Sequence, residues 1–439
     1  MRILIPSDVF PPDGRGGAAW SAYALAIGLQ TRGHQVRVIV PCRTPCRKPL
    51  TDHNGHLPVQ RVPYAAPSIP FIQNYFRYER FWPRLAQTLM TTVRDLGGVD
   101  VIHAQHTQTA AAAVIAGASL GVPVVVTVRD HWPWDYFATG LHGNRIPHPG
   151  RSLPAIATDL IGRLGPLRGV LAWPAIPYIV THLRKRATLL AQADAVIAPS
   201  NYIARRLTGI VDPARIHVLP NMVDIAASDA IAATPPQTTW EGTLVLFAGK
   251  LEANKGAELL IDVINDLATR QNELPPFTLL IAGDGALRPA IDRALATSGV
   301  SGRVLAWVEH DELLRLTARC DVLLFPSNWG EPLARALIEA AALGAPIIAM
   351  PTGGTPDIIR HGETGILAPT VATMVEWVIR LLNDPALRQR LGAAARATAA
   401  ERFDANRLLP RYEALYTALA HRDRSSNMPT RLTARYQIR

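Results

Sequence analysis

The sequence is poor in cysteine. Cys42, Cys46 and Cys320 are the only cysteines in 439 residues. Their number is odd, and Cys42 and Cys46 have no second pair with which to complete a tetrahedral zinc site. We therefore expect reduced thiols rather than a framework of disulfides, and no structural zinc.

Long apolar runs are also missing. The uncharged stretch 110–128 is rich in alanine and is divided by Gly121-Val122-Pro123, so it predicts a helix, a turn and a buried strand rather than a membrane span. The apolar residues that follow Met1 and Arg2 stop at Pro6, which is too short for the apolar region of a signal peptide. We expect neither a transmembrane helix nor export.

Lysine is scarce, and the charge is unevenly spread. Of 45 basic residues only four are lysines, namely Lys48, Lys185, Lys250 and Lys255. Residues 1–199 carry 20 Lys and Arg against 10 Asp and Glu, residues 200–420 carry 20 against 24, and residues 421–439 carry 5 against 1. A basic first half suits a nucleic acid, an anionic membrane surface or a phosphorylated substrate, and charge alone does not choose among these partners.

Apolar residues are plentiful, at 48% against 18% charged. Short runs of Val, Ile and Leu alternate with amphipathic stretches of helical length, which is typical of parallel sheets covered on both faces. These runs are Ile3–Pro6, Val36–Val40, Val101–His103, Val124–Val128 and Ala195–Ala198, and then Leu244–Ala248, Leu279–Ala282, Val304–Ala306, Val322–Pro326 and Pro346–Ala349. The sequence predicts an α/β protein with two Rossmann-like, doubly wound domains.

Breaks in this periodicity near Pro220-Asn221 and at 234–239 predict the junction between the domains. We expect domains at 1–200 and 201–404. A last helix is expected at 405–420, which is free to pack back on the first domain, followed by a basic tail at 421–439.

Two of the four lysines follow one predicted strand. Lys250 comes directly after Leu244–Ala248, and Lys255-Gly256 stands at the start of the next helix. Two ammonium groups at the carboxyl end of a strand, beside a helix N-terminus, suit a diphosphate. Ordinary solvated lysines are the alternative.

Two glutamates form a second constellation. Glu331 precedes a predicted helix, Leu333–Leu343, which contains Glu339. At 3.6 residues per turn and 1.5 Å per residue, we expect both side chains on roughly one side of this helix, about 12 Å apart along its axis. Glu331 would also suit the helix dipole, whereas Glu339 lies among apolar residues where a carboxylate must be paired or face a cleft. The two acids can accept hydrogen bonds from separate parts of one sugar-containing ligand.

These motifs, in this order, resemble those of the retaining glycosyltransferases of family 4, which have the GT-B fold. The resemblance extends over nearly the whole chain. It is carried by Phe10-Pro11-Pro12, Gly16-Gly17, Arg32-Gly33-His34, Pro220-Asn221-Met222-Val223-Asp224, Gly249-Lys250, Lys255-Gly256, Gly283-Asp284-Gly285, Glu331 and Glu339 with seven residues between them, and Gly353-Gly354. It implies two Rossmann-like domains that face a central cleft.

The resemblance also implies roles for individual residues. Lys250 and Lys255 would contact the donor diphosphate, Glu339 the nucleotide ribose, and Glu331 the transferred sugar. Gly16 and Gly17 would line the donor pocket or the catalytic face. The full set of expected donor-binding residues is Gly16, Gly17, Lys250, Lys255, Glu339, Gly353 and Gly354.

The sequence departs from the family at the end of Val124–Val128. The family commonly has a His-Asp pair there, whereas this chain has Arg129 and Asp130, followed by His131. Arg129 could pair with Asp130 or steady a phosphate, and His131 could act from the neighbouring position. The catalytic candidates are therefore Glu331, Asp130, Arg129 and His131, with His103 and His106, at the end of another strand, as further ones.

The activity implied by the resemblance is transfer of a sugar from a nucleotide diphosphate sugar to a hydroxyl acceptor, with retention of anomeric configuration. No D-x-D-like motif follows a strand, so we expect no metal and no other cofactor, and the departing phosphate would act as the base. The alternatives are an epimerase or phosphorylase of the same fold, or a catalytically idle binding protein, which only Arg129 suggests.

One segment suggests where the enzyme works. The uncharged run Gly169–Val180 contains two prolines, which argue against one straight helix, and is too short to span a bilayer. Its flanks are basic, at Arg163, Arg168, Arg184, Lys185 and Arg186. Such a segment suits a membrane interface, and a surface loop and helix over a core edge is the alternative. We expect a cytoplasmic enzyme at the inner face of a cell membrane, a lipid-linked or cell-envelope glycan as acceptor, and no nucleic-acid partner.

Overall fold

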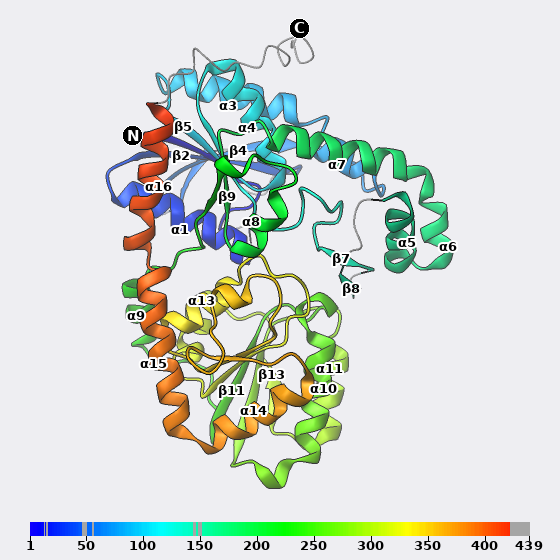
Figure 1. Cartoon of the computed structure of the whole chain (residues 1–439), viewed down its shortest axis with the longest axis vertical. Helices are drawn as coiled ribbons and strands as arrows, with labels where there is room; N and C mark the ends of the chain where they lie inside the picture. The colour runs from blue at the N-terminus through cyan, green and yellow to red at the C-terminus, as the bar shows by residue number, and fades with distance from the viewer. Residues whose placement is uncertain are drawn as a thin grey trace. The chain divides into compact units, whose positions relative to one another are not determined.

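The computed structural model describes residues 1–12, 14, 16–45, 51–54, 57–143, 146–147 and 152–421, with only the backbone at 51–54 and 146–147. The chain divides into two compact units (Figure 1). The first comprises residues 1–138, 172–219 and the chain from Leu408 onward, and the second comprises 139–171 and 220–407. The expected basic tail, apart from His421, lies outside the described residues.

The first unit is built on an eight-stranded sheet with the order β10-β9-β6-β5-β1-β2-β4-β3. All neighbouring strands are parallel except β3 and β4. The strands are β1 (Arg2–Pro6), β2 (Gln35–Arg43), β3 (Thr51–Asn54), β4 (Leu57–Tyr64), β5 (Val101–Gln105), β6 (Val124–Thr127), β9 (Ala195–Ala198) and β10 (Ile216–Val218). Because β1 lies inside the sheet, its apolar residues are buried on both faces.

Helices connect these strands in the doubly wound manner. They are α1 (Gly17–Thr31), α2 (Ile72–Arg77), α3 (Trp82–Asp95), α4 (Thr107–Leu120), α7 (Ile176–Leu190), α8 (Asn201–Leu207) and, from Leu408 onward, α16 (Ala405–Ala420). The alanine-rich stretch forms α4, a turn at Gly121 with φ of 69°, and the buried strand β6. This confirms the predicted helix, turn and strand.

The second unit contains a six-stranded parallel sheet with the order β13-β12-β11-β14-β15-β16. Its strands are β11 (Thr243–Ala248), β12 (Phe277–Ala282), β13 (Gly302–Val304), β14 (Val322–Phe325), β15 (Ile347–Ala349) and β16 (Ile366–Leu367). The helices around this sheet are α9 (Ile225–Ala232), which precedes β11, and then α10 (Ala257–Thr269), α11 (Arg288–Ser298), α12 (His310–Thr317), α13 (Arg335–Ala342), α14 (Val371–Asn383) and α15 (Pro385–Arg402).

Alternate residues of β11 enter the two cores of this unit. Val245 and Phe247 pack in the core that contains α10, α11 and α14, whereas Leu244 and Leu246 pack in the core that contains α9 and α13. A strand covered on both faces must be apolar throughout, which explains the continuous run in the sequence. The prediction of two doubly wound α/β domains is confirmed.

The second unit also includes a helical excursion. A short antiparallel pair, β7 (Leu141–His142) and β8 (Ile146–Pro147), leads into α5 (Leu153–Leu164) and α6 (Pro166–Leu171). The chain then passes through a 3-10 turn at Trp173–Ala175 into α7. Pro174 lies in this turn and Pro177 in the first turn of α7, so the uncharged run is not one straight helix, as predicted. No helix among the described residues has the length and apolarity needed to cross a membrane.

The first unit extends beyond the expected boundary at residue 200. The physical reason is that β10 pairs with β9 in parallel and continues the same sheet. Towards the C-terminus, Tyr416 of α16 packs on His103 of β5, so this helix belongs largely with the first unit.

Cys320 is a buried free thiol, whereas Cys42, at the end of β2, is disulfide-bonded. The expectation of reduced thiols is therefore wrong for Cys42; Cys46 lies outside the described residues.

Candidate active site

We call residues 249–256, which follow β11 and contain Lys250 and Lys255, the lysine loop. This loop of the second unit lies against the end of the neighbouring strand β14. Gly256 has a φ of 78°, which favours glycine. A Cβ atom there would lie 1.9 Å from the carbonyl oxygen of Pro326, directly after β14. Only a glycine allows this approach, and it brings Lys255 to the carboxyl ends of two adjacent strands.

Lys255 and Glu331 form an ion pair at this place. Lys255 Nζ lies 2.5 Å from Glu331 Oε1 and 4.3 Å from the centre of the Trp329 ring. The hydroxyl of Ser327 donates to the same Oε1 atom at 3.0 Å. Glu331 is buried, whereas the side chain of Lys255 is 27% exposed to solvent. The two predicted residues thus meet, with the cation reaching solvent.

Glu331 does not stand at a helix start, so the predicted spacing of the two glutamates along one helix is wrong. Helix α13 begins only at Arg335. The carbonyl of Glu331 accepts a hydrogen bond from the N–H of Gly354 at 2.6 Å, which turns the chain away from the helix. A Cβ atom on Gly353 would lie 2.3 Å from that carbonyl oxygen. Gly353 and Gly354 therefore support the backbone of Glu331.

Glu339 lies on α13 and is paired. Its Oε1 atom accepts from Arg335 Nε at 2.7 Å and lies 3.0 Å from His310 Nε2. Burial raises the pKa of Glu339, but the charge of Arg335 and the hydrogen bond from His310 outweigh burial and hold it below its ordinary value. The carboxylate of Glu339 is therefore ionised. As expected for a buried acid, it is paired, with Arg335 and His310.

Both glutamates share one feature. In each, Oε1 accepts two hydrogen bonds, and Oε2 has no hydrogen-bond partner among the described residues of the chain. A carboxylate oxygen held in this way can accept from a ligand hydroxyl. Lys250, by contrast, is exposed at the end of β11.

In the first unit, Asp130 forms an ion pair with His106 rather than with Arg129. His106 Nε2 lies 2.8 Å from Asp130 Oδ2, and the backbone N–H of Trp132 donates to Asp130 Oδ1 at 2.7 Å. Burial lowers the pKa of His106, but the Asp130 carboxylate outweighs burial and leaves this pKa raised. The same pairing holds the pKa of Asp130 down against the effect of burial.

The pair is held between two strand ends. His106 follows β5, has a φ of 87° and precedes α4. Asp8, after β1, accepts from the N–H groups of Gln108 and Thr109 in the first turn of α4, and its carboxylate lies 3.8 Å from His106 Nδ1. The imidazole thus lies between two carboxylates at the carboxyl edge of the sheet.

Arg129 and the remaining histidines have other neighbours. Arg129 donates to the side chain of Gln105 at 2.8 Å. His131 is fully buried, and Trp134 Nε1 donates to its Nδ1 at 3.2 Å. His103 is fully buried between Tyr416 and Thr127, and burial, with the charge of Arg129, lowers its pKa to about 3. His103 is therefore a neutral, structural residue.

The N-terminal glycines stand where α1 begins. Gly16 precedes the helix with a φ of 116°, and Gly17 is its first residue. A Cβ atom built on Gly16 would meet nothing within 4 Å. Here glycine is required by the backbone conformation, and the space beside it is open in the described structure.

Sequence reasoning missed several partners. Trp329 and His310 are remote in sequence from Lys255 and Glu339, the residues they contact, and no pattern indicated these contacts. Ser327 precedes Glu331 by only four residues, but neither residue lies in a helix, so no helical spacing indicated their contact. Arg335 had a visible signal, because it precedes Glu339 by one helical turn and such pairs meet on a helix surface.

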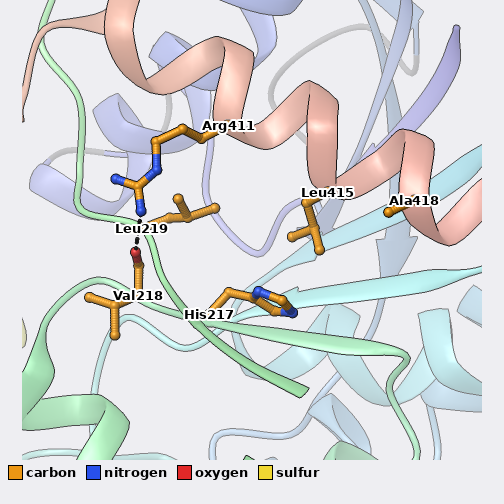
Figure 2. Close-up of a pocket in the computed structure, with 6 residues that line it drawn as sticks. All are labelled: His217, Val218, Leu219, Arg411, Leu415 and Ala418. Atoms are coloured by element: carbon orange, nitrogen blue, oxygen red, sulfur yellow. Dashed lines mark hydrogen bonds between the residues drawn. The ribbon is translucent and has the colours of Figure 1, made fainter. Parts of the chain in front are cut away.

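The first unit also contains a pocket of about 330 Å³, which is lined by other residues. It lies between β10 and α16, and Figure 2 shows the Arg411 guanidinium donating to the carbonyl of Val218 at 3.2 Å. The residues that line it are His217, Val218, Leu219, Arg411, Leu415 and Ala418. None of the predicted site residues is among them.

Comparison with known proteins identifies the family. The profile of Glycosyltransferase Family 4 matches residues 15–227, and that of Glycosyl transferases group 1 matches residues 235–398. The chain is 28% identical over 424 residues to a glycogen synthase of Mycobacterium tuberculosis, with 92% of this chain and 91% of that protein covered. It is 29% identical over 232 residues to a D-inositol 3-phosphate glycosyltransferase of Jonesia denitrificans, over 47% of this chain and 53% of the relative.

Solved structures agree in fold. HepE of Anabaena, in complex with UDP, has a TM-score of 0.67 at 18% identity, over 95% of this chain and 100% of that one. Sucrose-phosphate synthase of Thermosynechococcus elongatus has a TM-score of 0.67 at 19% identity, over 95% and 99%. The chain therefore belongs to the retaining glycosyltransferases of family 4, and is an enzyme of the GT-B fold that transfers a sugar from a nucleotide sugar.

Proposed function

We propose that the second unit holds a nucleoside diphosphate sugar through Lys255, Glu331 and Glu339, and that the sugar is transferred to a lipid-linked or cell-envelope glycan. The observation that carries the donor assignment is the shared arrangement of the two glutamates. In both, Oε1 is bound to the protein and Oε2 has no protein partner among the described residues. Two carboxylates held in this way suit the hydroxyls of a ribose and of a sugar.

Lys255 is suited to the diphosphate. An ammonium group has three donors, and only one described hydrogen bond, to Glu331, uses them. The Trp329 ring fixes the position of the ammonium group by a cation–π contact. The remaining donors can meet phosphate oxygens, and exposed Lys250, across the same loop, adds a second positive charge. Gly353 and Gly354 contribute by holding the backbone of Glu331.

The proposed reaction leaves the anomeric configuration unchanged. The bond between the sugar C1 and the phosphate oxygen breaks, and the acceptor oxygen forms a bond to C1 on the same face. The acceptor proton passes to the departing phosphate. Lys250 and Lys255 stabilise the negative charge that develops on the diphosphate, which is where preorganised cations contribute most to rate.

In the first unit, we assign to His106 the role of the active-site imidazole. The family commonly has this imidazole directly before the aspartate at the strand end. Its ion pair with Asp130 keeps it charged to higher pH than an ordinary histidine. Arg129 occupies the position directly before Asp130, where the family commonly has the histidine, and it contacts Gln105. The burial of His131 argues against its contact with substrate. Gly16 and Gly17 are proposed to leave room for the ligand where α1 begins.

UDP-glucose is the first donor to test, because HepE has been solved with UDP and with UDP-glucose. The experiment incubates the protein with UDP-glucose, UDP-N-acetylglucosamine, GDP-mannose, ADP-glucose and dTDP-glucose, and measures nucleoside diphosphate release. Release from one donor, lost in Lys255→Ala, supports the proposal. If the wild type releases no diphosphate from any donor, with or without glycan acceptors, the proposed donor function is rejected.

A further inference from the structure

Helices α5 and α6 form a hairpin with an unusual outer surface. Around its turn, large apolar side chains point away from the described part of the unit: Leu164 is 39% exposed, Leu167 75%, Val170 46% and Leu171 70%. We call these four residues, with exposed Arg168, the hairpin patch. A contiguous group of exposed leucines of this kind marks an interaction site more often than a solvent face.

The hairpin is a rigid support for this patch. A Cβ atom on Gly169 would lie 2.4 Å from the Cα of Ile161, so the two helices are in backbone contact. On its inner side, α5 carries Asp159, whose carboxylate accepts from the N–H of Gly143 at 2.7 Å. Arg163 pairs with the same carboxylate at 2.9 Å and donates to the carbonyl of Leu141 at 2.5 Å. Asp159 and Arg163 are thus directed inward, whereas the apolar residues of the hairpin patch face outward.

The charge of the surrounding segment selects the partner. Asp159 is the only acidic residue between Ser152 and Ala193, and it is buried and paired. Arg168 is the only exposed charged residue in the described hairpin, and it is basic. Apolar side chains beside an exposed cation, with no exposed acid on the same hairpin, are complementary to an anionic lipid surface. A second copy packed patch to patch would bring two Arg168 side chains together with no exposed acid to neutralise them.

We propose that the hairpin patch inserts into the interface of an anionic membrane and holds the enzyme there. This inference deepens the proposed acceptor class, on which its biological meaning rests, because a lipid-linked acceptor lies at such a surface. The leucines supply the salt-resistant part of the attachment, and Arg168 supplies a part that salt screens. Insertion of side chains at the interface needs no membrane-spanning helix.

Vesicle sedimentation tests the proposal without donor or acceptor. The full chain is mixed with vesicles of phosphatidylglycerol and phosphatidylcholine in equal parts, or of phosphatidylcholine alone, at low and high salt. We expect the protein to pellet with the mixed vesicles and to bind pure phosphatidylcholine at least about tenfold less. Arg168→Gln should lower partitioning about fivefold at low salt, and this difference should fade at high salt.

The decisive variant replaces Leu167 and Leu171 together by Ser. It should lower partitioning at least tenfold in both salt conditions. The matched control is Trp307→Ser, which removes an apolar side chain that is 44% exposed elsewhere in the second unit and should leave partitioning unchanged. Thermal unfolding checks that each variant folds, and diphosphate release without vesicles checks the donor site separately.

Three results would overturn the proposal: wild type that stays in the supernatant with anionic vesicles at low salt, a Leu167/Leu171 variant that binds like wild type, or a loss in Trp307→Ser of equal size. A concentration-dependent dimer that the double variant dissolves would instead assign the patch to a second copy. Intact diphosphate release together with failed sedimentation would reject the membrane inference alone. Intact sedimentation without release would reject the donor proposal alone.

Discussion

At the scale of single residues, Lys255 is the most informative side chain of the site. Its place after a strand was visible in the sequence, because lysine is rare in this chain. Its contact with Glu331 was not visible, because 75 residues separate the two and only the pairing of β11 with β14 brings them together. The sequence thus predicted the two groups but not their mutual charge compensation.

Replacing Lys255 with Ala should weaken nucleoside diphosphate binding by about 1.5–3 kcal/mol, the usual loss for a hydrogen bond to a charged group. Isothermal titration calorimetry measures this directly. Lys185→Ala is the control, since it removes an exposed lysine of α7 in the first unit. Unchanged affinity in a folded Lys255→Ala protein would remove this residue from the diphosphate site.

The two glutamates should differ in what they bind. Glu339→Gln keeps the shape but removes the charge, so we expect weaker binding of both the nucleoside diphosphate and the sugar nucleotide, by about 1–3 kcal/mol. Glu331→Gln releases Lys255 from its ion pair, so binding of the plain diphosphate should not weaken, while sugar transfer should fall. Calorimetry with UDP and UDP-glucose separates these outcomes, and an equal loss of UDP affinity in both variants would contradict the division of roles.

At the scale of elements, the strands were easier to predict than the start of α13. Apolar runs buried on both faces are a local property, and they indicated both sheets. The start of α13 depends on a remote contact, since the Gly354 N–H occupies the Glu331 carbonyl that a longer helix would have used. Likewise, the meeting of His106 with Asp130 depends on β5 and β6 being neighbours in the sheet, which no single motif specifies.

The His106–Asp130 pair joins two strand ends and should make stability depend on pH. The raised pKa of His106 means that its contribution is fully present below the ordinary histidine value, about 6.5, and is lost as pH rises through the folded pKa. The lowered pKa of Asp130 acts oppositely, and its contribution is lost only as pH falls through the folded pKa of Asp130.

His106→Asn tests this linkage, because asparagine tolerates a positive φ and does not titrate. We expect wild type to exceed the variant in unfolding free energy by about 1.5 kcal/mol near pH 5.5, and by much less near pH 9. Urea unfolding at the two pH values measures the difference. A difference that does not change with pH would show that the imidazole charge has no part in stabilising these strand ends.

At the scale of the whole molecule, the two units carry different chemistry. The first contains the His106–Asp130 pair, and the second contains the lysine loop and both glutamates. The order of motifs along the chain predicted the two α/β domains. Position alone could not predict that residues 139–171 group with the second unit, because that grouping depends on packing between segments distant in sequence.

The donor site of the second unit is tested most directly by hydrogen exchange with mass spectrometry on the full chain, with saturating UDP, ADP, GDP or dTDP. For the nucleotide that binds, we predict slower exchange in peptides covering 249–257, 327–339 and 351–357, and unchanged exchange in the α5–α6 hairpin. Protection confined to the pocket between β10 and α16, or no protection of the three peptides by any of these nucleotides, would contradict the assignment of the donor to Lys255, Glu331 and Glu339.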